Sequence, residues 1–417
     1  MSWFKRAPPG PAPEDAAAAP SVPTRAPPHD YTIESEVLAH YFDFNRGEID
    51  ASIAACQACA GRDSVNRIAW FIPNAASAFA AGIHTILRVA DYLWRVHGIA
   101  QVFCVDRAPS IEAARERIAE AYPELAAAAE IVPLAQIGVA PTLGPVDAAI
   151  ATLWITALSV LRLRDVRRKL YFVQDWEPEF YPAGSSSALV EATYRFGFHA
   201  LCSSPALAVC YREFGGSAEH FTYAVDTTVF HPNRSPRADE APFTLFAYGR
   251  PFQPRNCYEL VAAALHVIKA QLGDRIDIVL AGGTWDPAAH GLAGVARNLG
   301  MVPHGSMGDV YRSADIALCL TASRNPSVVM LELMACGTPV VTTRNIYHGW
   351  MSAGDAVWFE SEPSRGALAA TVLDVLRRPD RGEVHASRAL ALIRQRFADW
   401  TPACELVARA VTHRDAE

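Results

Sequence analysis

The sequence predicts an α/β protein built from two Rossmann-like domains that face each other across a cleft. Short runs of consecutive apolar residues alternate with helix-like stretches, a pattern typical of parallel sheets covered by helices on both faces. A polar, Pro-containing break at residues 233–241 divides this alternation into two series. With 417 residues, the chain is long enough for two domains of ordinary size.

The first series is expected to form an N-terminal domain at residues 31–235. Residues 1–30, which precede it, are rich in Pro and Ala and are expected to be a disordered tail. The domain should begin with an amphipathic helical extension up to residue 60. A helix is expected at residues 82–96, and strands at residues 67–73, 101–105, 147–153, 170–174, 200–203 and 219–222.

The second series is expected to form a C-terminal domain at residues 236–385. Its strands are expected at residues 243–248, 276–281, 316–320 and 339–343. Residues 386–417 should form helices that pack back on the N-terminal domain. In open α/β sheets the ligand site lies at the carboxyl ends of the strands, so the segments that follow the strands should carry the function.

Composition excludes several classes of protein. The formal net charge of −7 and the isoelectric point near 6.0 give no signal for nucleic acid or an anionic membrane. The nine scattered cysteines fit a reducing compartment better than a disulfide scaffold. The longest apolar run, residues 148–161, is shorter than the ~20 residues that span a membrane. We expect a cytoplasmic protein without an N-terminal signal segment; peripheral association with the inner face of the membrane stays open.

The segment at residues 323–341 reads as a loop, a helix and a strand. Pro326 suits the first turn of a helix, Ser327 can satisfy free N–H groups beside Val328, and Gly337 ends the helix. Such a helix start favours an anion such as a diphosphate. Glu332 lies about a turn and a half further on, where a carboxylate could accept hydrogen bonds from sugar hydroxyls. An ordinary αβ unit of a parallel sheet is the alternative.

The second domain opens with a strand that runs into Gly249, followed by Arg250 and Arg255 on one loop. Two guanidinium groups five residues apart can converge on an anion, and their contacts with phosphate are often bidentate. After the next strand, Gly282 would let a backbone approach a ligand closely. The alternatives are two surface arginines on an ordinary loop and a tight turn.

In the first domain, polar and aromatic residues follow two predicted strands. Gln174, Asp175, Trp176 and Glu177 come after one, with further aromatic residues behind them, and Thr152 and Trp154 after another. Aromatic faces and carboxylates together suit carbohydrate, because sugar C–H faces pack on rings and hydroxyls need acceptors. A loop with solvated acids is the alternative.

These segments resemble the retaining GT-B glycosyltransferases of the large family four. Leu331 to Val340 match the second half of that family's donor signature, and Arg250 with Arg255 stand where a Gly-Arg and a later basic residue grip the donor diphosphate. Gly82 falls in the place of the family's N-terminal Gly-rich loop, which approaches donor phosphates and acceptor. His84 follows it; a capping or packing histidine is the alternative there.

The resemblance implies transfer of a sugar from a nucleoside diphosphate to an acceptor hydroxyl, with retention. It implies that Arg250, Arg255 and the helix start stabilise the diphosphate, that Glu332 holds the ribose and that Asp175 orients the acceptor or a donor hydroxyl. Glu177 stands beside Asp175 as a further catalytic candidate. No metal and no cofactor are expected beyond the nucleoside diphosphate sugar as co-substrate. The acceptor would be a glycan, either free or lipid-linked.

Within this family the chain looks most like the rhamnosyltransferases of bacterial S-layer and O-antigen-type glycans. The blocks 152–157, 174–184, 194–198 and 249–256 carry that likeness, which favours dTDP-L-rhamnose as donor. Arg324 occupies the position of the Glu that usually contacts the donor sugar. Three explanations stay open: a 6-deoxy sugar that is held differently, a common hexose such as that of GDP-mannose or a UDP-hexose, and a non-catalytic glycan- or nucleotide-binding subunit. GDP-fucose is a further donor to consider, and an epimerase of the same fold is a remote alternative.

Overall fold

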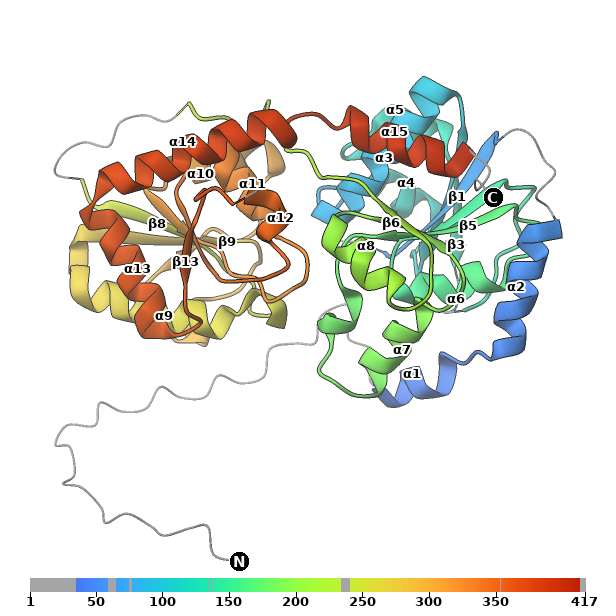
Figure 1. The fold of residues 1–417 in the computed structure, drawn as a ribbon, viewed down its shortest axis with the longest axis horizontal. Helices are drawn as coiled ribbons and strands as arrows, with labels where there is room; N and C mark the ends of the chain where they lie inside the picture. Colours follow the sequence, from blue (N-terminus) through green and yellow to red (C-terminus); the bar gives the residue numbers. More distant parts are fainter. Residues whose placement is uncertain are drawn as a thin grey trace, which may run out of the picture.

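The computed structural model describes residues 35–58, 65–74, 77–134, 136, 138–233, 241–352 and 354–412. The tail predicted at residues 1–30 lies outside these residues, and so does the domain boundary predicted between residues 235 and 236. The described chain forms two α/β units, each built on a parallel sheet (Figure 1). The predicted fold class is confirmed.

Within the described residues, the first sheet has seven parallel strands in the order β3-β2-β1-β4-β5-β6-β7. The order reverses between β1 and β4, and this switch opens a crevice at the carboxyl ends of the strands. The inner strands are almost fully buried, as their continuous apolar sequences require. The strands are β1 (Arg67–Ile72), β2 (Ala100–Asp106), β3 (Glu130–Leu134), β4 (Ala148–Ala151), β5 (Arg168–Val173), β6 (His199–Cys202) and β7 (Ala218–His220).

Helices cover both faces of this sheet (Figure 1). The predicted N-terminal extension forms the two helices α1 (Ser35–Tyr41) and α2 (Arg46–Ala58). Buried Lys169 fastens α2, because its Nζ donates to Ser52 Oγ at 2.7 Å and to the carbonyls of Leu161 and Leu163 at the end of α6. The others are α3 (Ala81–His97), α4 (Ile111–Ala119), α5 (Pro123–Ala128), α6 (Trp154–Arg162), the 3-10 turn η1 (Glu177–Phe180), α7 (Ser185–Thr193) and α8 (Pro205–Arg212).

In the described chain, the second sheet has six parallel strands in the order β10-β9-β8-β11-β12-β13. Its order reverses between β8 and β11, so it has a crevice of the same kind. The strands are β8 (Phe243–Tyr248), β9 (Ile276–Ala281), β10 (Arg297–Asn298), β11 (Ile316–Leu318), β12 (Val340–Thr343) and β13 (Phe359–Ser361). The short edge strands β10 and β13 were not among the predicted strands, because two or three residues leave no readable apolar run.

The helices of this unit lie on both faces of its sheet (Figure 1). The α-helices are α9 (Tyr258–Leu272), α10 (His304–Ser313), α11 (Val328–Ala335), α12 (Gly349–Ser352), α13 (Arg365–Arg377) and α14 (Pro379–Arg396). The 3-10 turns are η2 (Pro254–Asn256), η3 (Gly273–Arg275) and η4 (Ala288–His290). Helix α14 packs on α11 and α13, so the chain remains on the second unit up to residue 396. Among the described residues, none of the helices combines the length and the apolar character that crossing a membrane requires.

The last helix, α15 (Thr401–Thr412), crosses back to the first unit and packs on α3 (Figure 1). Tyr92 on α3 donates its hydroxyl to Glu405 Oε1 at 2.6 Å. The segment that leaves the first unit runs beside the returning chain, and the Val225 N–H donates to the Phe397 carbonyl at 2.7 Å. The two crossings between the units are therefore bonded to each other.

Phe230, in the first crossing, fastens that segment to the second unit. It is almost fully buried, lies nearly parallel to the Tyr311 ring at a centroid distance of 5.8 Å, and meets the His304 ring edge-on. We expect Phe230→Ala to lower the free energy of unfolding by about 3–5 kcal/mol, because it leaves a cavity. Chemical denaturation followed by circular dichroism measures this. The exposed Tyr41→Ala is the control, with an expected change within about 0.5 kcal/mol; equal effects of the two substitutions would contradict the assignment.

Candidate functional site

One pocket of about 350 Å³ lies between the carboxyl ends of the two sheets. From the first unit it is lined by residues that follow β1, β4 and β5, namely Pro73, 80–83, 152–154 and 174–181 in part. From the second it is lined by the segments that follow β8 and β11, at 248–256 and 321–329 in part. The topological switch points of both sheets thus open into a single cavity.

Most of the predicted site residues meet in this pocket. Those that line it are Gly82, Thr152, Trp154, Gln174, Asp175, Glu177, Arg250, Arg255, Ser327 and Val328. The other predicted residues, all in the described part of the chain, do not line it: His84, Trp176, Gly249, Gly282, Arg324 and Glu332.

The two arginines after β8 have different surroundings. Arg255 Nε lies 3.2 Å from Asp175 Oδ2, and its guanidinium group stacks on the Phe180 ring at 4.3 Å. Arg250 Nη1 donates to the Tyr248 hydroxyl at 3.2 Å, and among the described residues Arg250 has no carboxylate partner. Arg250 is therefore the cation in the pocket whose charge is available to an anionic ligand.

Glycines support this loop rather than contact the pocket. A Cβ at Gly249 would lie 2.7 Å from Leu280 Cδ2, so a side chain there would collide with β9. Gly282 has a φ of 114°, which favours glycine, and a Cβ there would lie 2.7 Å from the Tyr248 ring. Both glycines therefore let the ends of β8 and β9 pack closely together. Arg250 follows directly after this contact.

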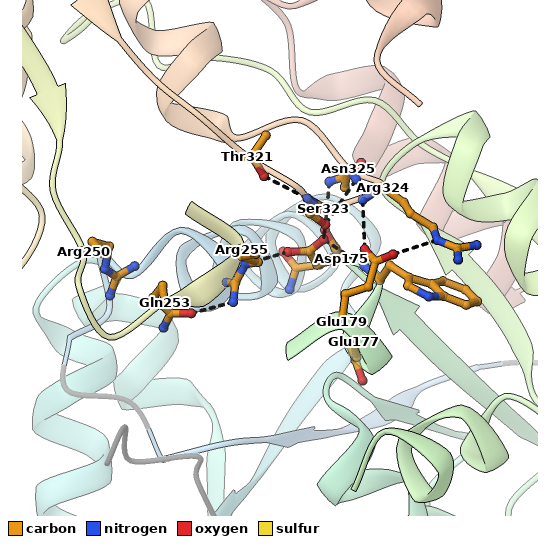
Figure 2. A network of polar contacts seen from close by, with 12 residues as sticks. Asp175, Glu177, Glu179, Arg250, Gln253, Arg255, Thr321, Ser323, Arg324 and Asn325 are labelled. Carbon is orange, nitrogen blue, oxygen red and sulfur yellow. Dashed lines mark hydrogen bonds and ion pairs between the residues drawn. The ribbon is translucent and has the colours of Figure 1, made fainter. Parts of the chain in front are cut away.

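Asp175 is held from both units. Its Oδ1 accepts a hydrogen bond from the Ser323 hydroxyl of the second unit and one from the Trp176 N–H at 2.8 Å. Its Oδ2 faces Arg255 of the second unit. Figure 2 shows this contact in the centre of the polar network, with Arg250 on one side and Arg324 on the other. The carboxylate therefore has all of these partners only when the two units are together.

Glu177 borders the pocket, but its carboxyl group is enclosed by the first unit. Its Oε2 accepts from the Trp154 N–H and from the Tyr171 hydroxyl, each at 2.7 Å. Burial raises the pKa of this carboxyl to about 8, so it is mostly protonated at neutral pH. In this structure Glu177 fastens the start of α6 to β5 and does not face the cavity as a free acid.

The start of α11 differs in detail from the prediction. Ser327 is the N-cap residue, but among the described residues its side chain makes no capping hydrogen bond, and Pro326 precedes the cap instead of lying in the first turn. The Met330 N–H donates to the Ser327 carbonyl at 3.0 Å, and the N–H groups of Val328 and Val329 have no partner within the helix. Ser327, Val328 and Val329 line the pocket, so α11 begins at its wall. Asn325, just before them, donates its Nδ2 to the Gln174 carbonyl of the first unit at 2.9 Å.

Glu332 lies further along α11 and outside the pocket lining. Its Oε2 accepts from the Tyr311 hydroxyl at 3.3 Å. Burial raises the pKa of this carboxyl to about 8. In this structure the Glu332 carboxyl group is therefore hydrogen bonded to helix α10.

His84 and Trp176 are packed away from the pocket. The His84 ring lies among the rings of Phe79, Tyr122 and His304, with centroid distances of 5.4–5.5 Å, and burial lowers its pKa to about 4. Trp176 packs on Tyr194 and Phe214. For His84 the packing alternative describes this structure.

Arg324 points out of the pocket toward the first unit. Its Nε lies 3.0 Å from Glu179 Oε1, and its guanidinium group lies over the Trp176 ring at 4.7 Å. Figure 2 shows Arg324 and Glu179 facing each other on the side of Asp175 remote from Arg250.

Sequence reasoning left out several residues that the structure brings to the pocket. They are Phe180, Tyr181, Tyr223, Tyr248 and Asn325 as lining residues, and Ser323 as the partner of Asp175. Phe180 and Tyr181 follow the acidic block directly and carried a readable signal. Ser323 carried none, because a serine before a helix is common. Among the described residues no group of three or more His, Cys, Asp or Glu side chains could hold a metal ion.

Comparisons with known proteins agree with this architecture. A family model described as the WsaF N-terminal domain matches residues 67–202, and one described as the WsaF C-terminal domain matches residues 244–373. The O-antigen biosynthesis protein RfbC of Myxococcus xanthus is 36% identical over 334 residues, which are 78% of this chain and 26% of that protein. The chain thus spans about a quarter of the length of this relative.

Solved structures share the fold at low identity. HepE of Anabaena in complex with UDP and glucose has a TM-score of 0.62 at 16% identity and covers 83% of this chain and 99% of its own. WaaG, a glycosyltransferase involved in lipopolysaccharide biosynthesis, has a TM-score of 0.59 at 12% identity, covering 83% and 100%. Sucrose-phosphate synthase of Thermosynechococcus elongatus has a TM-score of 0.61 at 15% identity, covering 83% and 98%. The two units form a GT-B fold.

The buried Glu177 should make stability depend on pH. Its pKa of about 8 lies above the value near 4.3 of an unfolded Glu, so between these values the folded state holds a proton that the unfolded state has lost. This contribution is fully present below the unfolded pKa and is lost as pH rises through 8. We expect Glu177→Gln, which keeps an acceptor for Trp154 and Tyr171, to make this loss shallower by at most about 1.4 kcal/mol per pH unit.

Denaturation of the wild type and Glu177→Gln at pH 5, 6, 7 and 8 measures this slope. Glu332, whose pKa is raised to about 8 as well, remains in the variant, so the decline should become shallower and not vanish. Parallel curves for the two proteins would show that the Glu177 carboxyl is ionised in the fold.

Proposed function

Because this chain belongs to the WsaF family, whose N-terminal and C-terminal domain models match residues 67–202 and 244–373, we propose that it is a glycosyltransferase of surface-glycan assembly. It moves a sugar from a nucleoside diphosphate to a hydroxyl of a growing glycan. The single observation that carries the proposal is the pocket between the carboxyl ends of both sheets, where Arg250, the start of α11 and Asp175 converge.

The donor diphosphate binds at Arg250 and at the start of α11. Arg250 has no carboxylate partner among the described residues, and α11 begins at the pocket, which Ser327, Val328 and Val329 line. Both favour an anion, the first by a charge-assisted bond and the second by the helix dipole. A structural neighbour, HepE, is described in complex with UDP and glucose, which supports a nucleotide-sugar ligand for this fold.

We propose dTDP-L-rhamnose as the donor, with GDP-mannose, GDP-fucose and UDP-hexoses as alternatives. The likeness of residues 152–157, 174–184 and 249–256 to rhamnosyltransferases supports it. The orientation of Arg324 supports it as well, because Arg324 replaces a sugar-binding Glu and is paired with Glu179 outside the pocket. A 6-deoxy sugar has one hydroxyl fewer to satisfy.

The acceptor is a glycan hydroxyl that enters from the first unit. Phe180 and Tyr181 line that side of the pocket, with the buried Trp154 edge-on to Tyr181, and aromatic faces suit the C–H faces of sugars. The name of the M. xanthus relative places that protein in O-antigen biosynthesis, which supports a surface glycan as acceptor here. A lipid-linked acceptor would bring the enzyme to the inner face of the membrane.

The reaction proceeds with retention and without a metal ion. The bond between the sugar anomeric carbon and the diphosphate oxygen breaks, and its electron pair stays with the diphosphate. The acceptor oxygen forms the new bond on the same face and passes its proton to the departing diphosphate. Arg250, Arg255 and the α11 N–H groups stabilise the charge that develops there, and Asp175 orients the acceptor or a donor hydroxyl.

The test is nucleotide release with each of the four donors and a rhamnose-containing acceptor. Release from dTDP-L-rhamnose alone supports the full proposal, and release from another donor keeps the enzyme class but changes the sugar. A non-catalytic binding subunit predicts no release, while the free nucleotide still raises the melting temperature.

Arg250→Ala should weaken nucleotide binding by about 1.5–3 kcal/mol, because a charge-assisted bond to the diphosphate is lost. Calorimetric titration with the nucleotide of the active donor measures this. Arg297→Ala, which breaks an exposed pair with Asp277 on the same unit, is the control and should bind normally. Equal affinities of both variants and the wild type would show that the diphosphate binds elsewhere.

Asp175→Asn should lower kcat by about a hundredfold and change the donor KM little. The amide keeps a hydrogen-bond acceptor for Ser323 but loses the negative charge facing Arg255. Steady-state kinetics with the active donor separates the two constants. Unchanged kcat would make Asp175 a structural contact between the units.

A further inference from the structure

Arg324 extends from the second unit into a socket formed by Glu179, Trp176 and Cys210 of the first unit and Tyr347 of the second. Its Nε lies 3.0 Å from Glu179 Oε1, and its backbone N–H donates to Glu179 Oε2 at 3.3 Å, so one residue engages both carboxylate oxygens. The guanidinium group lies between two rings, Trp176 of the first unit at 4.7 Å and Tyr347 of the second at 5.2 Å. Nη1 contacts Cys210 Sγ of helix α8 at 3.6 Å.

In both units, the residues that form the socket lie next to the residues that hold Asp175. On the second unit, Ser323 precedes Arg324 and donates its hydroxyl to Asp175. On the first unit, Trp176 follows Asp175, and Glu179 lies on η1 beside Phe180, on which Arg255 stacks. The Arg324–Glu179 contact therefore lies next to the groups that hold Asp175 (Figure 2).

The loop that carries Arg324 is itself fixed within the second unit. Asn345 Nδ2 donates to the Ser323 carbonyl at 2.8 Å, and the buried His348 side chain interacts with the backbone of Ser323 and Asn325. Since the loop is anchored there, the position of Arg324 follows the position of the whole second unit and not that of a free loop.

We propose that Arg324 is a positioning residue, whose pair with Glu179 sets the closed arrangement in which Ser323 and Arg255 orient the Asp175 carboxylate. This inference rests on the proposed function for its kinetic part only. It assigns a role to Arg324, which stands where a sugar-binding Glu is usual. In this chain the residue at that position contributes to the contact between the units. Exposed ion pairs contribute little, but here about two-thirds of each side chain is buried, at exposures of 28% and 34%, and the cation is stacked between rings.

The test compares Arg324→Ala and Glu179→Gln with the wild type in kinetics, nucleotide binding and small-angle scattering. We expect kcat to fall about 10- to 100-fold, because the acid is misplaced. The affinity for dTDP and UDP should stay within about threefold of the wild type, because Arg250 and the start of α11 are intact. The radius of gyration should increase. Arg344→Ala, which breaks the pair of Arg344 with Glu360 inside the second unit, is the matched control and should change none of these.

Charge exchange separates a pairing role from a local structural role. The double variant Glu179→Arg with Arg324→Glu should recover kcat by on the order of threefold over either of its single variants, together with the smaller radius. Additive losses in this cycle would overturn the proposal. A loss of nucleotide affinity in Arg324→Ala as large as that of Arg250→Ala would overturn it too, because Arg324 would then contact the donor.

The scattering measurement needs no turnover and keeps this inference distinct from the proposed function. If no donor gives turnover but the radius increases in both single variants and not in Arg344→Ala, the contact between the units stands while the enzymatic proposal fails. If the radius and kcat of both variants match the wild type, the positioning role is wrong while the transferase remains.

Discussion

The Asp175 carboxylate is the point at which the two units depend on each other. A carboxylate surrounded by protein must be matched by donors and positive charge. Here the first unit provides the strand end that carries Asp175, and the second provides the Ser323 hydroxyl and Arg255. The neighbouring contacts follow the same division: Asn325 reaches the Gln174 carbonyl, and Arg324 reaches Glu179. Neither unit alone satisfies the acid, so the site exists as a joint property of both sheets.

The fold could be predicted from the sequence because burial on both faces of a parallel sheet forces continuous apolar strands, such as β1 and β5, separated by helices. The same logic located the pocket, since the residues after those strands must share one edge of the sheet. It could not give side-chain directions. Glu177 and Asp175 are two residues apart, yet one is enclosed with Trp154 and Tyr171 and the other faces the second unit. Arg324 was expected at the donor site, at the position of a sugar-binding Glu, and the sequence could not show that it pairs with Glu179.

The charge of each acidic side chain at the site depends on whether a cation lies next to it. Asp175 meets Arg255, whereas Glu177 and Glu332 meet only neutral donors among the described residues, and burial raises the pKa of each to about 8. With those two carboxyls largely protonated at neutral pH, the pocket keeps the positive charge of Arg250. The arrangement thus leaves net positive charge on the donor side without a lysine, which this chain hardly uses.

The chain passes between the units twice, before residue 233 and again after residue 396, and the two passages are hydrogen bonded at Val225 and Phe397. Trp400 lies edge-on to Tyr223 at this point and is covered by the Arg88 guanidinium group. Two tethers joined at one place act as a single pivot. Because both tethers are covalent, the two units stay together even when the contacts at Asp175 and Glu179 are broken. Each reopening is therefore a unimolecular step, and the separated halves of the pocket remain at a high effective concentration toward one another.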